Sequence, residues 1–258
     1  MAKQDKEVEI LKLTTGRISA YILGVTPLIY NSMNSKVQRD LLYPRKKTAA
    51  EKAATAKHDP MAEFQRSVYS VPTGPTLLSF PVVAFKRALA SAALDLGGGK
   101  RTQMERLVWA VGEHAPVWGV PQLRMDVVRS ADQNRTPDVR TRAILSQWAC
   151  KIDLAFVTPA ISETVVLNLL QGAGLIRGIG DFRQEKGAGN YGQFELVNSD
   201  DERWHVIVNS AGREAQIAAM ADPSCYDADS EDLLVWWQQE FQRRGHADNA
   251  KAAQKVLS

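Results

Sequence analysis

A glycine-rich segment between Gln171 and Phe194 carries the residue types best suited to bind an anion. Its glycines are Gly172, Gly174, Gly178, Gly180, Gly187, Gly189 and Gly192, and they alternate with Arg177, Arg183, Lys186 and Tyr191. Glycine lets a backbone approach a ligand closely, arginine can bind a phosphate through two N–H groups, and a tyrosine ring offers a face to a base. The segment predicts phosphate and base contacts; a flexible connection between a helix and a strand is the alternative.

Further cations are expected to join this segment on one surface. The candidates are Lys36, Arg39, Arg45, Lys46, Lys47 and Lys52 in a basic insertion, Lys86 and Arg87 on a predicted helix, and Arg135 and Arg140 at the tip of a predicted hairpin. A solvated helical face is the alternative for the insertion and for the helix. The formal net charge is only +3, so a preference for a polyanion must come from where these charges lie. Several separate basic elements favour binding to a single-stranded backbone.

The sequence contains no clear motif for catalysis or for cofactor binding. Gly187–Gly192 matches the letters of the dinucleotide fingerprint, but the expected helix precedes it and the expected strand follows it, which is the reverse order. The four histidines have no metal-binding spacing, and two cysteines cannot build a disulfide framework. We therefore expect no cofactor, no metal and no catalytic residue. A metal-independent ribonuclease with His58 or Asp40 as the base is the enzymatic alternative.

The composition is that of a globular protein. With 258 residues and 45% hydrophobic residues, the chain can bury a full core, and we expect one elaborated domain over residues 1–258. No apolar run reaches the length of a membrane span, and the first residues lack the apolar core of a signal peptide. A cytoplasmic location without membrane contact is the expectation.

The pattern of apolar residues predicts an α+β fold. Alternation from Glu7 to Ile29 predicts a strand that is apolar on both faces, as in the centre of a sheet. Other strands are expected at Leu77–Phe80, near Val108, near Val117, at Gln193–Val197 and at Trp204–Val208. Helices are expected at Pro81–Leu96, after an N-cap at Ser162, and at Ser230–Arg244. A long hairpin is expected from Gln122–Val128 and Ile144–Val157.

The order strand, helix, hairpin, helix, strand is that of a ferredoxin-like, or RRM-like, domain. On this plan, residues 31–66 are a helical basic insertion, residues 122–157 are a long hairpin, and residues 198–258 are a C-terminal extension.

Three features resemble the RAMP superfamily across residues 16–197. They are the first strand leading into an insertion, the helix start Phe80-Pro-Val-Val-Ala-Phe-Lys-Arg-Ala-Leu89, and the helix followed by the glycine-rich loop and Tyr-Gly-Gln-Phe. Within that superfamily the chain is similar to the RNA-binding backbone subunits that polymerise along guide RNA in CRISPR effector complexes.

The resemblance implies a palm with a thumb at 122–157 and a finger at 31–66. It also implies a ribonucleoprotein filament for antiviral defence, with the guide RNA, further copies of the chain and other effector-complex subunits as partners. Family members that cleave target RNA require an Asp in the loop after the first strand. This chain reads Thr26-Pro-Leu-Ile-Tyr-Asn-Ser-Met33 there, with no Asp before Asp40, so the resemblance implies a non-catalytic subunit.

Two other functions remain open from the sequence. One is a phage or plasmid single-stranded DNA-binding or recombination accessory protein on the same palm. RNA and DNA of equal sequence would distinguish it, because only RNA carries the 2′-hydroxyl. The other is a structural or inhibitory protein that mimics a filament subunit, for which we expect weak nucleic-acid affinity and a stable protein partner.

Overall fold

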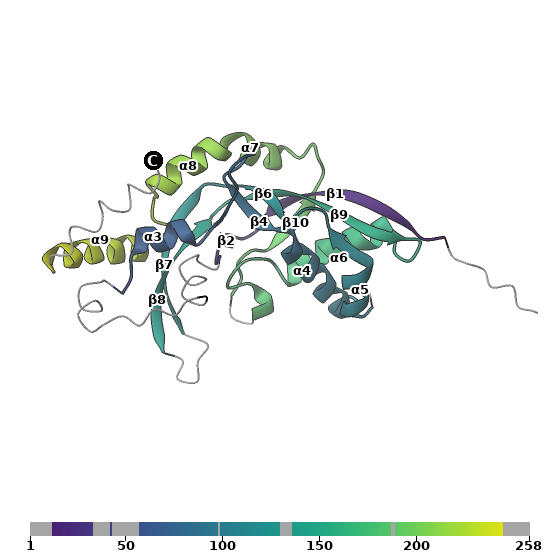
Figure 1. Ribbon diagram of the computed structural model, residues 1–258, viewed down its shortest axis with the longest axis horizontal. Coiled ribbons are helices and arrows are strands. Elements are labelled where there is room, and N and C mark those ends of the chain that lie inside the picture. The colour runs from purple at the N-terminus through teal and green to yellow at the C-terminus, as the bar shows by residue number, and fades with distance from the viewer. Residues whose placement is uncertain are drawn as a thin grey trace, which may run out of the picture.

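The computed structural model describes residues 12–32, 42, 57–97, 99–129, 136–186 and 189–244. In this part of the chain the fold is α+β with antiparallel sheets, which confirms the expected fold class (Figure 1). The larger sheet has the strand order β10 (Phe194–Val197), β1 (Thr14–Gly24), β9 (Ala149–Thr158), β6 (His114–Trp118), β4 (Leu78–Pro81), β3 (Tyr69–Ser70). A further strand, β5 (Val108–Ala110), also pairs with β9.

Strand β1 lies inside the sheet, as its two apolar faces predict. Ala20 and Ile22 face the main core, while Tyr21 and Leu23 face a second cluster on the other side of the sheet. The strand ends at Gly24, five residues before the predicted end. A side chain on Gly24 would overlap the ring of Trp148, so the backbone passes directly under that ring. The predicted start at Glu7 lies outside the described residues.

Helices α4 (Val82–Asp95) and α6 (Glu163–Ile176) pack against each other on one face of the sheet. Small residues allow the close approach, since Ala88, Ala92 and Ala173 form their contact. Both helices begin where the sequence predicts: α4 follows Pro81, and the Ser162 side chain caps α6 by accepting from the N–H of Val165 at 3.4 Å. In α6, Val166, Leu169 and Leu170 are buried as predicted, whereas Val165 is exposed.

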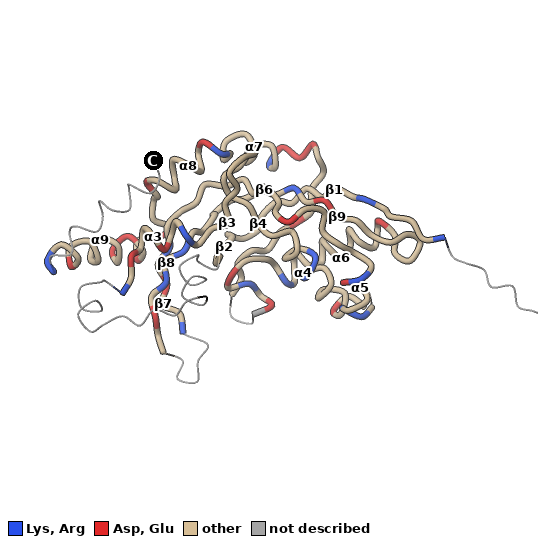
Figure 2. Tube along the Cα trace, viewed as in Figure 1, with Lys and Arg blue, Asp and Glu red and all other residues tan. Residues whose placement is uncertain are grey.

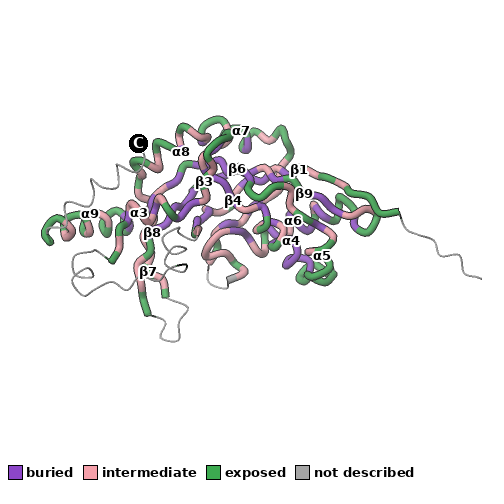
Figure 3. Tube along the Cα trace, viewed as in Figure 1, coloured by how far each residue is buried: buried purple, intermediate pink, exposed green. Residues whose placement is uncertain are grey.

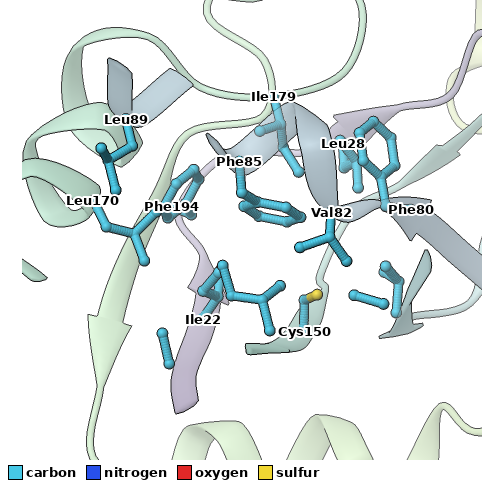
Figure 4. Packing of buried hydrophobic residues seen from close by; sticks show 14 of the residues in the cluster. Ile22, Leu28, Phe80, Val82, Phe85, Leu89, Cys150, Leu170, Ile179 and Phe194 are labelled. Carbon is cyan, nitrogen blue, oxygen red and sulfur yellow. The ribbon is translucent and has the colours of Figure 1, made fainter. Parts of the chain in front are cut away.

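The core lies between these two helices and the sheet. Phe85 and Leu89 from α4 and Leu170 from α6 meet Ile22 and Phe194 from the strands (Figure 4). The buried positions follow the strands and the inner sides of the helices (Figure 3). In the described part of the chain, no helix is both long and apolar enough to cross a membrane.

A second, three-stranded sheet contains the hairpin and differs from the sequence prediction. Its order is β2 (Leu28–Ile29), β8 (Pro137–Leu145), β7 (Pro121–Arg129). The hairpin partner of β7 is therefore 137–145, and 149–158 is a separate strand that pairs with β1. The largely apolar sequence from Ile144 to Val157 predicts one continuous strand. In the structure the strand is interrupted at Ser146–Gln147, where the chain passes from one sheet to the other. The hairpin projects from the body of the molecule (Figure 1).

The described part of the C-terminal extension, residues 198–244, contains α7 (Glu202–Ser210), α8 (Arg213–Ala221) and α9 (Ala228–Arg243). The strand predicted at Trp204–Val208 is wrong, because these residues belong to α7. Asp201 caps this helix by accepting from the N–H of Arg203, and the ring of Trp204 packs edge-on to Tyr21 on the outer face of the sheet. A run of β-branched residues resembles a strand, but their contacts follow helical spacing.

Two short helices, α3 (Pro60–Arg66) and α5 (Arg101–Leu107), were not predicted individually. The first lies in the predicted basic insertion and packs on β8. Helix α9 matches the predicted Ser230–Arg244 closely.

Candidate nucleic-acid interface

A hollow of about 360 Å³ lies between α4 and the glycine-rich segment. Four predicted site residues line it: Arg87, Gly178, Gly180 and Arg183. Asn31, Asp181 and Glu185 add polar groups, and Tyr69 and Phe80 supply aromatic rings. The hollow therefore offers cations, an amide, carboxylates and apolar rings within one small space.

The glycines of this segment let the chain pack on itself. The N–H of Gly192 donates to the carbonyl of Pro27 at 2.8 Å, and its own carbonyl accepts from Ile179 at 2.9 Å. A side chain on Gly192 would overlap the Ile179 carbonyl oxygen, and one on Gly189 would overlap that of Phe182. The sequence analysis predicted that these glycines approach a ligand. Close packing of the chain on itself is enough to explain why glycine stands at these positions.

The same packing fixes the segment to the residues that follow β1. The N–H of Asp181 donates to the carbonyl of Ile29 at 3.0 Å, and Gly180 lies with φ +83° against the same carbonyl. Only a residue without a side chain fits this left-handed backbone at such close approach. The floor of the hollow is thus built from backbone of two distant parts of the chain.

Two predicted phosphate ligands, Arg177 and Arg183, already have carboxylate partners. Arg177 pairs with Asp95 and lies 3.9 Å from Glu185, while Arg183 Nη2 lies 2.8 Å from Glu185 Oε2. Arg183 also donates to the carbonyl of Gly180 at 2.9 Å. Sequence reasoning missed Asp95 because it comes from α4, far away in the chain. It also missed Glu185, although this residue is only two positions from Arg183.

Glu185 is held ionised by these guanidinium groups. Partial burial opposes its charge, but the hydrogen bond from Arg183 and the nearby Arg177 outweigh that cost and lower the pKa of Glu185. The carboxylate thereby neutralises part of the positive charge at the mouth of the hollow.

Arg87 is the exposed cation of the hollow. Within the described ranges it forms no hydrogen bond and no ion pair, so its guanidinium is available to an anion. Its neighbour Lys86 is half-buried on α4 and does not line the hollow.

The remaining predicted residues lie elsewhere or outside the described ranges. Tyr191 accepts a hydrogen bond from Arg124 at 2.6 Å, and the Arg124 guanidinium lies 4.8 Å from the centre of its ring. Arg140 is exposed on β8, where cationic and acidic positions follow one another along the hairpin (Figure 2). Outside the described residues fall Lys36, Arg39, Arg45, Lys46, Lys47, Lys52, Arg135, Gly187 and the side chain of Lys186.

A buried arginine that the sequence did not single out joins the hairpin to the glycine-rich segment. Arg142 is 3% exposed and pairs with Asp126 at 2.7 Å and with Asp181. Asp181 also accepts from the side chain of Asn31 at 2.9 Å. Because Asn31 and Asp181 line the hollow, this network fixes one of its walls.

His58, the candidate base of the enzymatic alternative, is engaged at both ring nitrogens. Nδ1 lies 2.9 Å from Glu63 and Nε2 lies 3.1 Å from Asp138. The hydrogen bond from Lys57 to Asp138 and the proximity of His58 lower the pKa of this carboxyl. In this arrangement His58 links α3 to β8 and has no free nitrogen for a substrate; Asp40 lies outside the described residues.

The described ranges hold no group of three His, Cys, Asp or Glu side chains placed to bind a metal ion.

Comparisons with known proteins find distant structural similarity only. No protein-family model matches the sequence, and no curated protein matches it. A chain of the type III-B Cmr-beta complex bound to cognate target RNA is similar over 71% of this chain and 59% of its own length, with 14% identity and a TM-score of 0.37. Cmr6 from Pyrococcus furiosus is similar over 73% of this chain and 100% of its own, with 12% identity and a TM-score of 0.31. Similarity at these values assigns the chain to no family.

Proposed function

We propose that the protein is a non-catalytic, single-stranded RNA-binding subunit of a CRISPR-type effector complex that oligomerises along a guide RNA. The RNA would cross the hollow between α4 and the glycine-rich segment, and its partners would be further copies of the chain and other effector subunits.

The arrangement of the larger sheet supports a ferredoxin-like palm. In the strand order β10–β1–β9–β6, the outer strands follow helices α6 and α4, and both helices cover one face. A ferredoxin-like domain places its βαββαβ elements in this way. The hairpin β7–β8 then takes the place of the thumb that the sequence resemblance implies.

The observation that carries the proposal is the convergence of Arg87, Arg183, Gly178 and Gly180 on one hollow. Arg87 lies on α4, in the N-terminal half of the chain, and the other three lie in a segment about ninety positions later. Cations beside a backbone floor suit a phosphate strand, and the partly exposed ring of Tyr69 suits a base.

Substitution of Arg87 by alanine tests this proposal directly. We expect weaker binding of single-stranded RNA and a slope of log affinity against log salt that is smaller by roughly one, because one phosphate contact is lost. Arg106→Ala is the matched control, since Arg106 is also exposed and lies on α5, away from the hollow. Equal affinity and salt slope in both variants would count against the proposal.

Removal of the Glu185 charge should have the opposite effect on RNA binding. Glu185→Gln releases Arg183 from its carboxylate partner, whereas Arg177 keeps its pair with Asp95, so we expect several-fold tighter binding and a steeper salt dependence. Glu105→Gln is the control, because Glu105 pairs with Arg101 on α5. Unchanged affinity in Glu185→Gln would mean that Arg183 does not reach the RNA.

The same variant should alter stability in acid. Since the folded-state pKa of Glu185 is lowered, its contribution is complete above the ordinary value of 4.5 and is lost as the pH falls through the lowered pKa. Urea unfolding between neutral pH and about pH 3 should therefore show a shallower loss of stability in Glu185→Gln than in the parent chain.

Mass measurement with a guide-length oligonucleotide tests the oligomer. We expect several copies per RNA strand, a preference for RNA over DNA of equal sequence, and no cut products. A single copy per strand would contradict the filament, and stronger DNA binding would favour the recombination accessory protein.

A further inference from the structure

The N-terminal half of β1 has one free edge. Strand β9 pairs with β1 from Thr14 to Leu23, whereas β10 pairs only with Tyr21–Gly24 on the other side. Residues Thr14–Ala20 therefore have no strand on their second side within the described ranges. Figure 1 shows β1 extending past β10.

The direction of the backbone groups along this edge follows from two hydrogen bonds. The N–H of Gly24 donates to Trp148 on the β9 side, and the N–H of Val25 donates to Gln193 on the β10 side. Because N–H groups alternate along a strand, those of Thr15, Arg17 and Ser19 point to the free edge. An added strand would find regularly spaced donors and acceptors there.

A hollow of about 290 Å³ lies beside this edge, where a continuation of β10 would run. Ile18 and Ala20 of β1, Leu167 of α6 and Leu196 of β10 provide its apolar lining. The chain leaves the sheet after Val197, and Asn198 and Ser199 border the same hollow. The edge thus combines free backbone groups with room for apolar side chains.

We propose that a second copy of the chain adds its residues 7–13 to this edge as an antiparallel strand, and receives the same segment in return. The segment reads Glu-Val-Glu-Ile-Leu-Lys-Leu. Because alternate side chains of a strand lie on one face, Val8 and Ile10 can be paired with Ile18 and Ala20 so that all four side chains lie on the same face of the sheet. Its glutamates complement Arg17, which is exposed and has no ion pair among the described residues. Reciprocal exchange of one strand closes a two-fold dimer.

A second copy is the occupant because the same chain cannot reach its own edge. Residues 10–13 lead directly into β1 and contain no glycine, proline, asparagine or aspartate with which to reverse direction. The dimer is independent of RNA binding, so it is measured on protein freed of nucleic acid.

Sedimentation of the full chain and of two variants at Ser19 tests the proposal. Ser19→Pro removes the outward N–H at an edge position that tolerates proline, while Ser19→Ala keeps it and removes the hydroxyl that bonds Asp153. We expect dimers for the parent chain and for Ser19→Ala, and monomers for Ser19→Pro. A monomeric parent chain, or a Ser19→Pro variant as dimeric as Ser19→Ala, overturns the proposal.

Ile10→Asp provides a second test that leaves the sheet itself unchanged. It places a charge in the segment that would enter the hollow, so we expect a monomer with the thermal melting profile of a folded chain. A dimer of unchanged affinity would exclude residues 7–13 as the occupant, whatever the outcome at Ser19.

Discussion

Gly192→Ala should cost more than about 4 kcal/mol in the free energy of unfolding, because the change combines an unfavourable backbone with a backbone overlap. Gly192 has φ +71°, and the new Cβ would lie 2.8 Å from the carbonyl carbon of Ile179 and closer still to its oxygen. The N–H of Ile179 donates to the carbonyl of Gly192, and this hydrogen bond holds the two backbones at their close distance. Urea unfolding followed by circular dichroism measures the loss.

Gly112→Ala separates the two causes. Gly112 has φ +81°, a similar left-handed backbone, but its added Cβ would meet nothing within 4 Å. We expect a cost of only about 1–2 kcal/mol there, the price of the backbone conformation alone. Equal losses in the two variants would show that close packing of the glycine-rich segment contributes nothing.

Arg142→Ala should destabilise the protein by about 3–5 kcal/mol, since it leaves two carboxylates without their buried partner. Asp126 and Asp181 both pair with this guanidinium, which is 3% exposed; after its removal Asp126 keeps only Arg124 and Asp181 keeps only the uncharged Asn31 as a side-chain partner. We also expect weaker RNA binding, because Asp181 would no longer fix the wall of the hollow. Chemical denaturation and RNA titration of the same preparation measure both effects.

Two further variants show whether charge pairing is the cause. Arg203→Ala removes an arginine that also bridges two carboxylates, Glu195 and Asp201, but its side chain is 61% exposed; its effect on stability should be small. Arg142→Met combined with Asp181→Asn removes one buried charge pair and leaves Asp126 paired with Arg124 at 2.8 Å, so it should recover part of the lost stability. If this double variant is no more stable than Arg142→Ala, unpaired charge is not what destabilises it.

The elements predicted well from the sequence are those whose local signals agree. At α6, an N-cap at Ser162, a first-turn glutamate and buried Val166, Leu169 and Leu170 all indicate the same helix. At α4, Pro81 marks the start and Gly97, with φ +69°, follows the end. Capping and periodicity act within a few residues, so one sequence is enough to read them.

The elements predicted wrongly depend on contacts between distant residues. Trp204–Val208 has the composition of a strand, yet Asp201 caps it as a helix and Tyr21 and Trp118 receive Trp204. The second hairpin strand was misplaced because an apolar run does not reveal which sheet each half will join. Tertiary packing decided the position of the hairpin strand, whereas for α7 the N-cap at Asp201 is a local signal that the strand interpretation overlooked.

For the candidate site, the sequence identified residue types better than their partners. It predicted Arg87, Arg183, Gly178 and Gly180 as site residues, and in the structure all four line the same hollow. It did not show that Asp95 pairs with Arg177, or that Arg142 is buried between Asp126 and Asp181. Ion pairs between residues far apart in the chain have no local pattern.

Asn31 and Ser32, the residues that follow β2, are attached at two points. The side chain of Asn31 donates to Asp181, and the N–H of Ser32 donates to the carbonyl of Ser67 at 2.7 Å. Lys57 and His58, which precede α3, both contact Asp138 on β8. Because Asp138 and Asp181 belong to different parts of the chain, loss of one carboxylate would leave the other attachment in place, so the two connections can be weakened one at a time.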